Sequence, residues 1–283
     1  MDIHDFKTFL EVSRTRHFGQ AAANLFITQS TVSARIRLLE DQLGTKLFVR
    51  QRNNIQLTPA GERMLSYAEL ITTAWNRARQ DIGVAEPGQQ SFVVGGMSSL
   101  WDITLQKWLE TIYHEQKNLV IYAEVQTATV LQKRILNGTM DLAFLYDVPQ
   151  NDELVVVRLP DIQLILVSSQ PDKSCTDSMS EKYILVDWGP VFLTQHAQAF
   201  TDIPNPMLHI GLGRIALELL LSGGGSAYLA EPMIDEYLQS GVVHRVQDAP
   251  VFHRAAYAIY NKNNDKGDLV KVLLGNIGDG CNP

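Results

Sequence analysis

The chain has 283 residues, of which 45% are hydrophobic, with 24 basic and 31 acidic side chains. This size allows two or three domains, each with its own core. No segment reaches the roughly 18 consecutive apolar residues of a membrane span, and the opening residues lack the basic and apolar regions of a secretory signal. Cys175 and Cys281 lie far apart without further ligands at zinc-site spacing, which excludes a disulfide framework or a metal site as an inference from sequence. We therefore expect a cytoplasmic globular protein that needs no metal or cofactor and contacts no membrane.

The net charge of −7 is unevenly distributed along the chain. Residues 1–79 contain 11 basic and 7 acidic side chains, whereas residues 80–283 contain 13 basic and 24 acidic ones. Because exposed charges act within about a Debye length, roughly 10 Å in 0.1 M salt, a polyanion would be attracted to the N-terminal part only. The distribution indicates a nucleic-acid partner for this part, and a solvated basic surface is the alternative.

Three helices are predicted in the first 44 residues. Apolar residues recur at helical spacing from Ile3 to Leu10, and an alanine-rich second helix follows at 18–25. The third helix begins after Thr28, a typical N-cap residue, and ends at Gly44. Its apolar residues share one face, so polar and basic groups occupy the other. Two helices joined by a tight turn, the second polar toward solvent, are typical of a helix-turn-helix that reads the major groove.

The candidate DNA-binding residues lie on the third helix and on the hairpin that follows it. Strand-like runs at 46–50 and 55–58 flank a turn rich in cations, which predicts a wing beside the helix. A surface hairpin with chance charges is the alternative. Glutamine suits pairing with adenine, whereas wing arginines suit the DNA backbone. The predicted DNA-binding residues are Gln29, Ser30, Thr31, Ser33, Arg35, Arg37, Arg50, Arg52 and Asn53.

A long helix is predicted from Pro59, and its apolar residues are spaced alternately by four and three. This spacing is typical of one side of a two-stranded coiled coil, and a helix packed on its own domain is the alternative. The segment from Glu86 to Gln90 is then typical of a linker. The predicted dimer-helix residues are Met64, Ala68, Ile71, Trp75, Ala78 and Ile82.

Beyond Ser91, apolar strands alternate with amphipathic helices. Strands at 92–96, 119–125 and 140–146, with helices at 100–114 and 130–136, predict a mostly parallel sheet covered on both faces. A second series of elements, from 163–167 to 256–260, predicts another lobe, and a tail helix at 269–274 would return to the first lobe. Ligands of such sheets bind beyond the carboxyl ends of the strands, here toward a cleft between the lobes.

Candidate ligand-binding residues of the cleft follow these strands, although capping or core packing is the alternative for each of them. Bulky tryptophans could also leave the cleft filled by the protein itself. The candidate residues are Ser98, Ser99, Trp101, Gln126, Thr127, Tyr146, Asp147, Trp188 and Arg214.

One segment favours a different class of protein. Residues Gly211–Ala216 fit the dinucleotide-binding pattern G-x-G-x-x-G/A, and Glu231 follows at a suitable distance. This is the alternative of a nucleotide-dependent oxidoreductase. Against it, the preceding strand is short and is flanked by Pro204 and Pro206. No other catalytic motif is present in the sequence, so we expect no enzyme.

Six segments together resemble the N-terminal signature of LysR-type transcriptional regulators. They are 18–22, 28–33, 36–40, 43–44, 47–50 and 57–61. The resemblance implies that Gln29, Ser30 and Ser33 approach bases or phosphates. Many members have an arginine directly after the motif serine, but this chain has Ala34 followed by Arg35. Operator preference therefore cannot be transferred from the family.

The resemblance also implies the fold class and the division of the chain. We expect a winged helix-turn-helix, mainly α, at 1–58 and a linker and dimerisation helix at 59–86. A two-lobed α/β, periplasmic-binding-protein-like effector-binding and oligomerisation domain would occupy 90–283. Lobe I would comprise about 90–162 and 262–283, and lobe II about 163–261.

The resulting hypothesis is a sequence-specific transcriptional regulator. Its partners would be double-stranded DNA and further copies of itself, as a homodimer or homotetramer. A small-molecule effector would act through the cleft between the lobes. Its identity is unknown, and an anion is one candidate.

Overall fold

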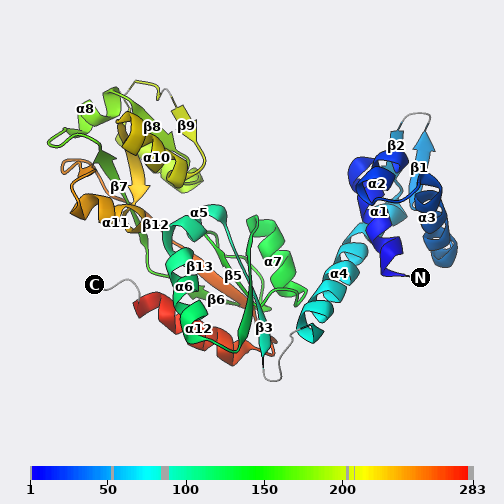
Figure 1. Ribbon diagram of the computed structural model, residues 1–283. Coiled ribbons are helices and arrows are strands. Elements are labelled where there is room, and N and C mark those ends of the chain that lie inside the picture. Colours follow the sequence, from blue (N-terminus) through cyan, green and yellow to red (C-terminus); the bar gives the residue numbers. More distant parts are fainter. Residues whose placement is uncertain (1, 52–53, 84–88, 202–203, 207, 280–283) are drawn as a thin grey trace. The chain divides into compact units, whose positions relative to one another are not determined.

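The computed structural model describes residues 2–51, 54–83, 89–201, 204–206 and 208–279 (Figure 1). The chain divides into two compact units, residues 1–90 and 91–283. Within the described residues, no helix combines the length and the apolar character that crossing a membrane requires.

The first unit contains four helices and a two-stranded hairpin among its described residues. The helices are α1 (Ile3–Thr15), α2 (Phe18–Asn24), α3 (Gln29–Leu43) and α4 (Pro59–Ile82), and the antiparallel strands are β1 (Phe48–Gln51) and β2 (Asn54–Leu57). The Thr28 side chain caps α3 by accepting from the Thr31 amide, and Gly44 ends α3 in the left-handed conformation. The local signals in the sequence therefore fix both ends of this helix.

The apolar face of α3 forms the centre of the first unit's core. Val32, Ile36 and Leu39 are fully buried with Phe9 of α1. The ring of Phe48, at the start of β1, lies 5.3 Å from the ring of Phe9. Burial of one face of α3 leaves its opposite face to solvent.

A buried carboxylate connects the end of α3 to the hairpin. Glu40 is 6% exposed. Its Oε1 accepts from the amides of Leu47 (2.9 Å) and Phe48 (3.4 Å), and its Oε2 accepts from Lys46 Nζ (2.8 Å). Burial alone would raise the pKa of Glu40, but these hydrogen bonds outweigh burial and lower it. The ionised carboxylate thus holds the first strand of the hairpin against α3.

The second unit begins with lobe I, defined by one five-stranded sheet and its helices. The sheet has the order β4-β3-β5-β13-β6; β3 and β5 are parallel, and β13 is antiparallel to β5 and β6. Its elements are β3 (Gln90–Gly96), β4 (Leu119–Val125), β5 (Leu142–Leu145), β6 (Leu154–Arg158), β13 (Tyr257–Asn261), α5 (Ser98–Leu100), the π-helix η1 (Trp101–Leu105), α6 (Gln106–Glu115), α7 (Ala128–Leu136) and α12 (Gly267–Asp279).

Lobe II consists of a second, six-stranded sheet and its helices. The order is β11-β7-β10-β8-β9, with β12 also paired to β7; β10 is antiparallel to β7 and parallel to β8. Its elements are β7 (Ile162–Ser168), β8 (Tyr183–Val186), β9 (Leu208–Ile210), β10 (Ser226–Ala230), β11 (His244–Arg245), β12 (Phe252–Arg254), α8 (Cys175–Ser180), α9 (Pro190–Ala199), α10 (Gly213–Gly223) and α11 (Glu231–Gln239).

Two features of this unit differ from the sequence-based expectation. Strand β13 belongs to lobe I, because Ala258 pairs with both Phe144 and Val157, so lobe II does not extend to residue 261. The sheets are also mixed rather than mostly parallel. Alternating hydrophobicity identifies a strand but does not identify its neighbours.

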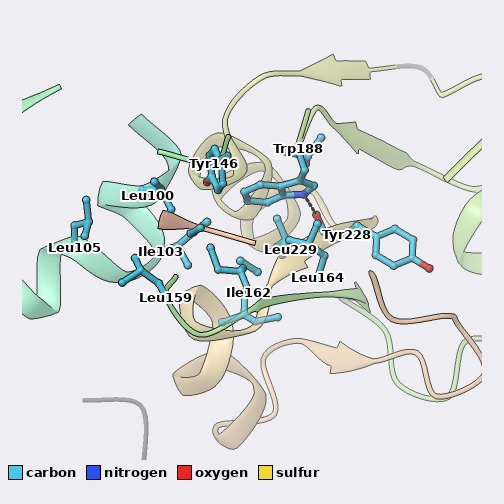
Figure 2. Packing of buried hydrophobic residues seen from close by; sticks show 14 of the residues in the cluster. Leu100, Ile103, Leu105, Tyr146, Leu159, Ile162, Leu164, Trp188, Tyr228 and Leu229 are labelled. Carbon is cyan, nitrogen blue, oxygen red and sulfur yellow. Dashed lines mark hydrogen bonds between the residues drawn. The ribbon is translucent and has the colours of Figure 1, made fainter. Parts of the chain in front are cut away.

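The two lobes of the second unit share a continuous hydrophobic core. Figure 2 shows Leu100 and Ile103 of lobe I on one side of this core and Trp188 and Leu229 of lobe II on the other. Helix α11 of lobe II also packs against η1 of lobe I. The junction of the lobes is therefore built largely from packed apolar side chains.

The buried carboxylate of Glu40 gives the first testable prediction. Glu40→Gln should speed amide hydrogen exchange at Leu47 and Phe48 at neutral pH, because a neutral amide is a weaker acceptor for these groups. Since the pKa of Glu40 is lower in the folded state, its stabilising effect should be present above the ordinary glutamate pKa and lost as pH falls through the folded value. Exchange measured by mass spectrometry should therefore differ between wild type and Glu40→Gln at pH 7 and converge in acid.

The matched control is Asp41→Asn, which removes the neighbouring exposed carboxylate. Equal exchange rates at the two amides in wild type and Glu40→Gln at pH 7 would contradict the role given to Glu40.

Candidate functional site

The exposed face of α3 carries most of the predicted DNA-binding residues. Gln29, Ser30 and Arg37 are exposed, and Thr31 and Ser33 are partly exposed. Thr28 Oγ1 lies 2.8 Å from the hydroxyl oxygens of both Ser30 and Thr31, so these hydroxyls form one cluster around the helix N-terminus. The amide groups and dipole of a helix N-terminus favour an anion such as a phosphate.

Of the other four predicted DNA-binding residues, one is partly buried and three have side chains outside the described part of the structure. Arg35 is partly buried and donates from Nη1 to Thr8 Oγ1 of α1 at 3.2 Å, which joins α3 to α1. Arg50 belongs to β1, but its side chain lies outside the described part of the structure, as do Arg52 and Asn53. The structure thus adds a packing role for Arg35.

The apolar residues of α4 divide between two faces. Ala68 is fully buried in the core of the first unit and Met64 packs against that core, because the first half of α4 lies on α1. This differs from the predicted dimer seam, in which both residues contacted a second copy. Ile71, Trp75 and Ile82 are 38%, 48% and 85% exposed, and Ala78 is partly exposed. Tyr67, 62% exposed and outside the predicted set, extends the same apolar face.

The carboxyl ends of three lobe I strands meet at one edge of the sheet. The Met97 amide donates to Phe144 O and the Gln126 amide to Gly96 O, which ties the segments after β3, β4 and β5 together. There Ser99 Oγ lies 2.7 Å from Tyr146 Oη, and Gln126 lies next to Glu124. Ser98, Thr127 and Asp147 are exposed at the same strand ends.

Both tryptophans predicted at the effector site are engaged within the protein. Trp188 is 3% exposed, and its Nε1 donates to Tyr228 O at 2.8 Å (Figure 2). Trp101 is partly buried and donates from Nε1 to Glu124 O at 3.0 Å. Trp188 is therefore a core residue of lobe II, which agrees with core packing, the alternative considered for this residue.

Charged groups from both lobes lie near these strand ends. Arg214 at the start of α10 is exposed and lies 3.5 Å from Glu218. Burial raises the pKa of Asp102 on η1, and the charge of Arg214 partly offsets that rise, so the lobe II cation acts electrostatically on Asp102. Sequence reasoning missed Arg254, whose guanidinium carbon lies 3.8 Å from the centre of the Tyr146 ring. Arg254 is the last residue of β12, a strand of three residues that is too short to be recognised by periodicity, so the sequence held no signal for it.

The glycines of the dinucleotide-like segment have a packing explanation. A Cβ at Gly213 would lie within 2.5 Å of the Trp188 ring, so the glycine lets the start of α10 approach that ring. A Cβ at Gly211 would meet nothing within 4 Å. The structure thus requires a glycine at Gly213, where the indole of Trp188 leaves no room for a side chain, but not at Gly211.

Comparison with known proteins agrees with this architecture. Residues 3–62 match the family described as bacterial regulatory helix-turn-helix protein, lysR family, and residues 85–282 match the LysR substrate binding domain. The chain belongs to the LysR family of DNA-binding transcriptional regulators.

Relatives and solved structures in this family cover nearly the whole chain. The HTH-type transcriptional regulator HdfR of Yersinia pestis (strain Pestoides F) is 38% identical, with 97% of this chain and 95% of the relative covered; HdfR of Yersinia pseudotuberculosis serotype O:1b gives the same values. The crystal structure of the LysR family regulator CbnR superposes with a TM-score of 0.71 at 17% identity, covering 100% of both chains. Vibrio fischeri DarR, solved in complex with DNA, gives a TM-score of 0.61 at 20% identity, covering 98% of this chain and 99% of that chain.

Family membership accounts for the two parts of the chain as a helix-turn-helix and a LysR substrate-binding domain. The family consists of regulatory transcription factors. Gly213 of the dinucleotide-like pattern is explained by its packing on Trp188. The matching family consists of transcription factors rather than oxidoreductases.

The packing at Gly213 gives the second prediction. Gly213→Ala should lower the free energy of unfolding by about 1–3 kcal/mol, because the added methyl group overpacks the Trp188 ring. Urea unfolding followed by tryptophan fluorescence measures this loss. Adding Trp188→Leu should reduce the penalty of Gly213→Ala, because the smaller side chain leaves room.

Gly211→Ala is the matched control and should change stability by no more than about 0.5 kcal/mol. Equal penalties at Gly211 and Gly213 would contradict the packing explanation.

Proposed function

We propose that this LysR-family regulator reads its operator mainly through the exposed face of α3. The observation that carries the proposal is the division of α3: its apolar face is buried, while its capped N-terminus presents exposed Gln29 and Ser30. Gln29 and Ser33 would contact base edges. Ser30, Thr31 and Arg37 would contact the DNA backbone, together with Arg50, Arg52 and Asn53 of the wing.

Structures of the same fold in complex with DNA support DNA as the partner. CbnR has been solved with its target DNA, and it superposes on this chain with a TM-score of 0.68 at 19% identity, covering 98% of this chain and 99% of that chain. We infer that the present chain likewise binds double-stranded DNA and acts in the cytoplasm. Residues 1–58 would bind the DNA, residues 59–86 would join two copies, and residues 90–283 would sense the effector and oligomerise.

The third prediction distinguishes residues that contact bases from residues that contact the DNA backbone. Gln29→Ala should relax preference at one base position by about 1–3 kcal/mol, because a bidentate contact is lost. Arg37→Ala should weaken binding to selected and random duplexes alike and reduce the salt dependence by about one phosphate contact. Selection of sites from random duplexes, followed by fluorescence anisotropy at several salt concentrations, measures both effects.

Arg245→Gln, an arginine change on β11 of lobe II, is the control and should leave DNA binding unchanged. If Gln29→Ala weakened binding to selected and random duplexes equally, its assignment to base readout would be wrong.

We further propose that two copies associate through the exposed apolar face of α4, formed by Tyr67, Ile71, Trp75, Ala78 and Ile82. An apolar face of this kind is stabilised by burial against a partner helix. The second unit carries further exposed apolar groups, Tyr113 on α6 and Ile215 and Leu219 on α10, which could extend a homodimer to a homotetramer.

The fourth prediction tests the α4 face. Trp75→Glu should shift the protein to smaller species in sedimentation velocity, because a charge would be buried at the interface. Asn76→Glu introduces the same charge at an exposed position on a different side of α4 and should leave the assembly unchanged. A change of assembly of the same size in both variants would count against an interface specific to the apolar face.

The effector would bind where the lobe I strands end and lobe II faces them. The groups available there include Ser98, Ser99, Gln126 and Thr127 of lobe I and Arg214 of lobe II. A ligand that binds one arrangement of the lobes better than another would shift the population of the DNA-binding form.

A further inference from the structure

The middle of the exposed face of α3 carries apolar side chains. Ala34 and Leu38 are four residues apart, which places them one helical turn from each other, and both are exposed, Leu38 by 47%. Ala34 lies on the side of the helix opposite the fully buried Val32 and Ile36. The face of α3 that we assign to DNA thus has a methyl group near its centre.

The arginine next to Ala34 in the chain is held on another side of the helix. Arg35 is partly buried, and its Nη1 donates to Thr8 Oγ1 of α1 at 3.2 Å. Arg37 is exposed, but the proposed function assigns its charge to the DNA backbone. We therefore expect Ala34 to meet the base edges with its own side chain.

The chemistry of alanine restricts what this side chain can recognise. A methyl group neither donates nor accepts a hydrogen bond, so it does not recognise a phosphate or a polar base edge. In the major groove thymine presents a methyl group of its own, at C5. Contact between the two methyl groups removes apolar surface from water, whereas a polar base edge against Ala34 would lose water without gaining a partner.

We propose that Ala34 recognises the C5 methyl group of a thymine in the operator, so that α3 specifies an A·T pair at that position. This inference rests on the proposed reading of DNA by α3 and adds a specificity-determining residue to it. Gln29 would select its base through hydrogen bonds, whereas Ala34 would select through an apolar contact. Leu38 continues the apolar surface by one turn.

The first step of the test locates the base pair that Ala34 contacts. Sites are selected from random duplexes with the full-length wild type and with full-length Ala34→Arg. A guanidinium can donate to O6 and N7 of guanine, so Ala34→Arg should change the preference at one base pair from A·T to G·C. The pair at which the two selections differ is the one assigned to Ala34.

The second step replaces the thymine of this pair by uracil, which lacks only the C5 methyl group. Fluorescence anisotropy should show that uracil weakens binding of the wild type about threefold to fivefold, the effect of one methyl group lost from an apolar contact. Ala34→Gly lacks the contacting methyl group and should bind the thymine and uracil duplexes equally. Circular dichroism checks that this variant is folded, and if it is not, the comparison of thymine and uracil with the wild type decides.

Two controls separate a specific contact from general effects. Ala197→Gly makes the same change at an exposed position of α9 in lobe II, and it should keep the discrimination of the wild type. Uracil in place of a thymine outside the selected site should leave the affinity of the wild type unchanged.

Several results would overturn the proposal. They are a wild-type preference other than A·T at this pair, an unchanged preference in Ala34→Arg, equal binding of thymine and uracil by the wild type, and the same loss with uracil in Ala34→Gly. If Gln29→Ala still relaxed the preference at its own base pair, only the role of Ala34 would be refuted. If the wild type selected no sequence at all, the proposed reading by α3 would be refuted and this inference with it.

Discussion

The geometry of the DNA-binding unit depends on the carboxylate of Glu40. One buried anion at the end of α3 accepts from the amides of Leu47 and Phe48 and from Lys46, so the start of the wing is tied to the helix. The start of α4 contacts the same segment of the chain, just before β1. Thr58 Oγ1 donates to Lys46 O at 2.7 Å, and Gly61 approaches the Leu47 carbonyl so closely that any Cβ would overlap it. The signature residues of this segment therefore have a physical purpose, which is to fix the wing between two helices.

Local signals predicted the DNA-binding unit well because they act within one or two helical turns. Thr28 caps α3, Gly44 ends it, and the spacing of Val32, Ile36 and Leu39 gives its buried face. The contacts of Glu40 and Arg35 could not be predicted, since their partners are fixed only when the elements pack. The seam of α4 was partly misassigned for a related reason. Apolar residues spaced by four and three are expected both on a helix face that packs against α1 and on a face that packs against a second copy. Only the fold shows that Ala68 lies on the face that packs against α1.

In the second unit, the alternation of strands and helices could be predicted from the sequence, but the order of the strands could not. Strand β13 joins lobe I because it pairs with β5 and β6, which lie about a hundred residues earlier in the chain. Some of the candidate effector residues lie together at the strand ends, whereas others are buried in a lobe. Ser99 and Tyr146 are brought together because the parallel strands β3 and β5 end at the same edge. Trp188 instead turns into lobe II, where it packs over Gly213. An apolar residue after a strand is equally compatible with a site and with a core, so composition alone could not separate these outcomes.

A packed junction restricts how such a protein can respond to a ligand. The hydrophobic core runs through both lobes, so separating them would expose apolar surface at a cost that a small ligand could not readily offset. Arg254 lies beside the second crossing between the lobes, and its guanidinium contacts the Tyr146 ring of lobe I. Because a ligand shifts an equilibrium only by its difference in affinity for the two states, a ligand of this unit would have to favour one of the arrangements that keep the shared core closed.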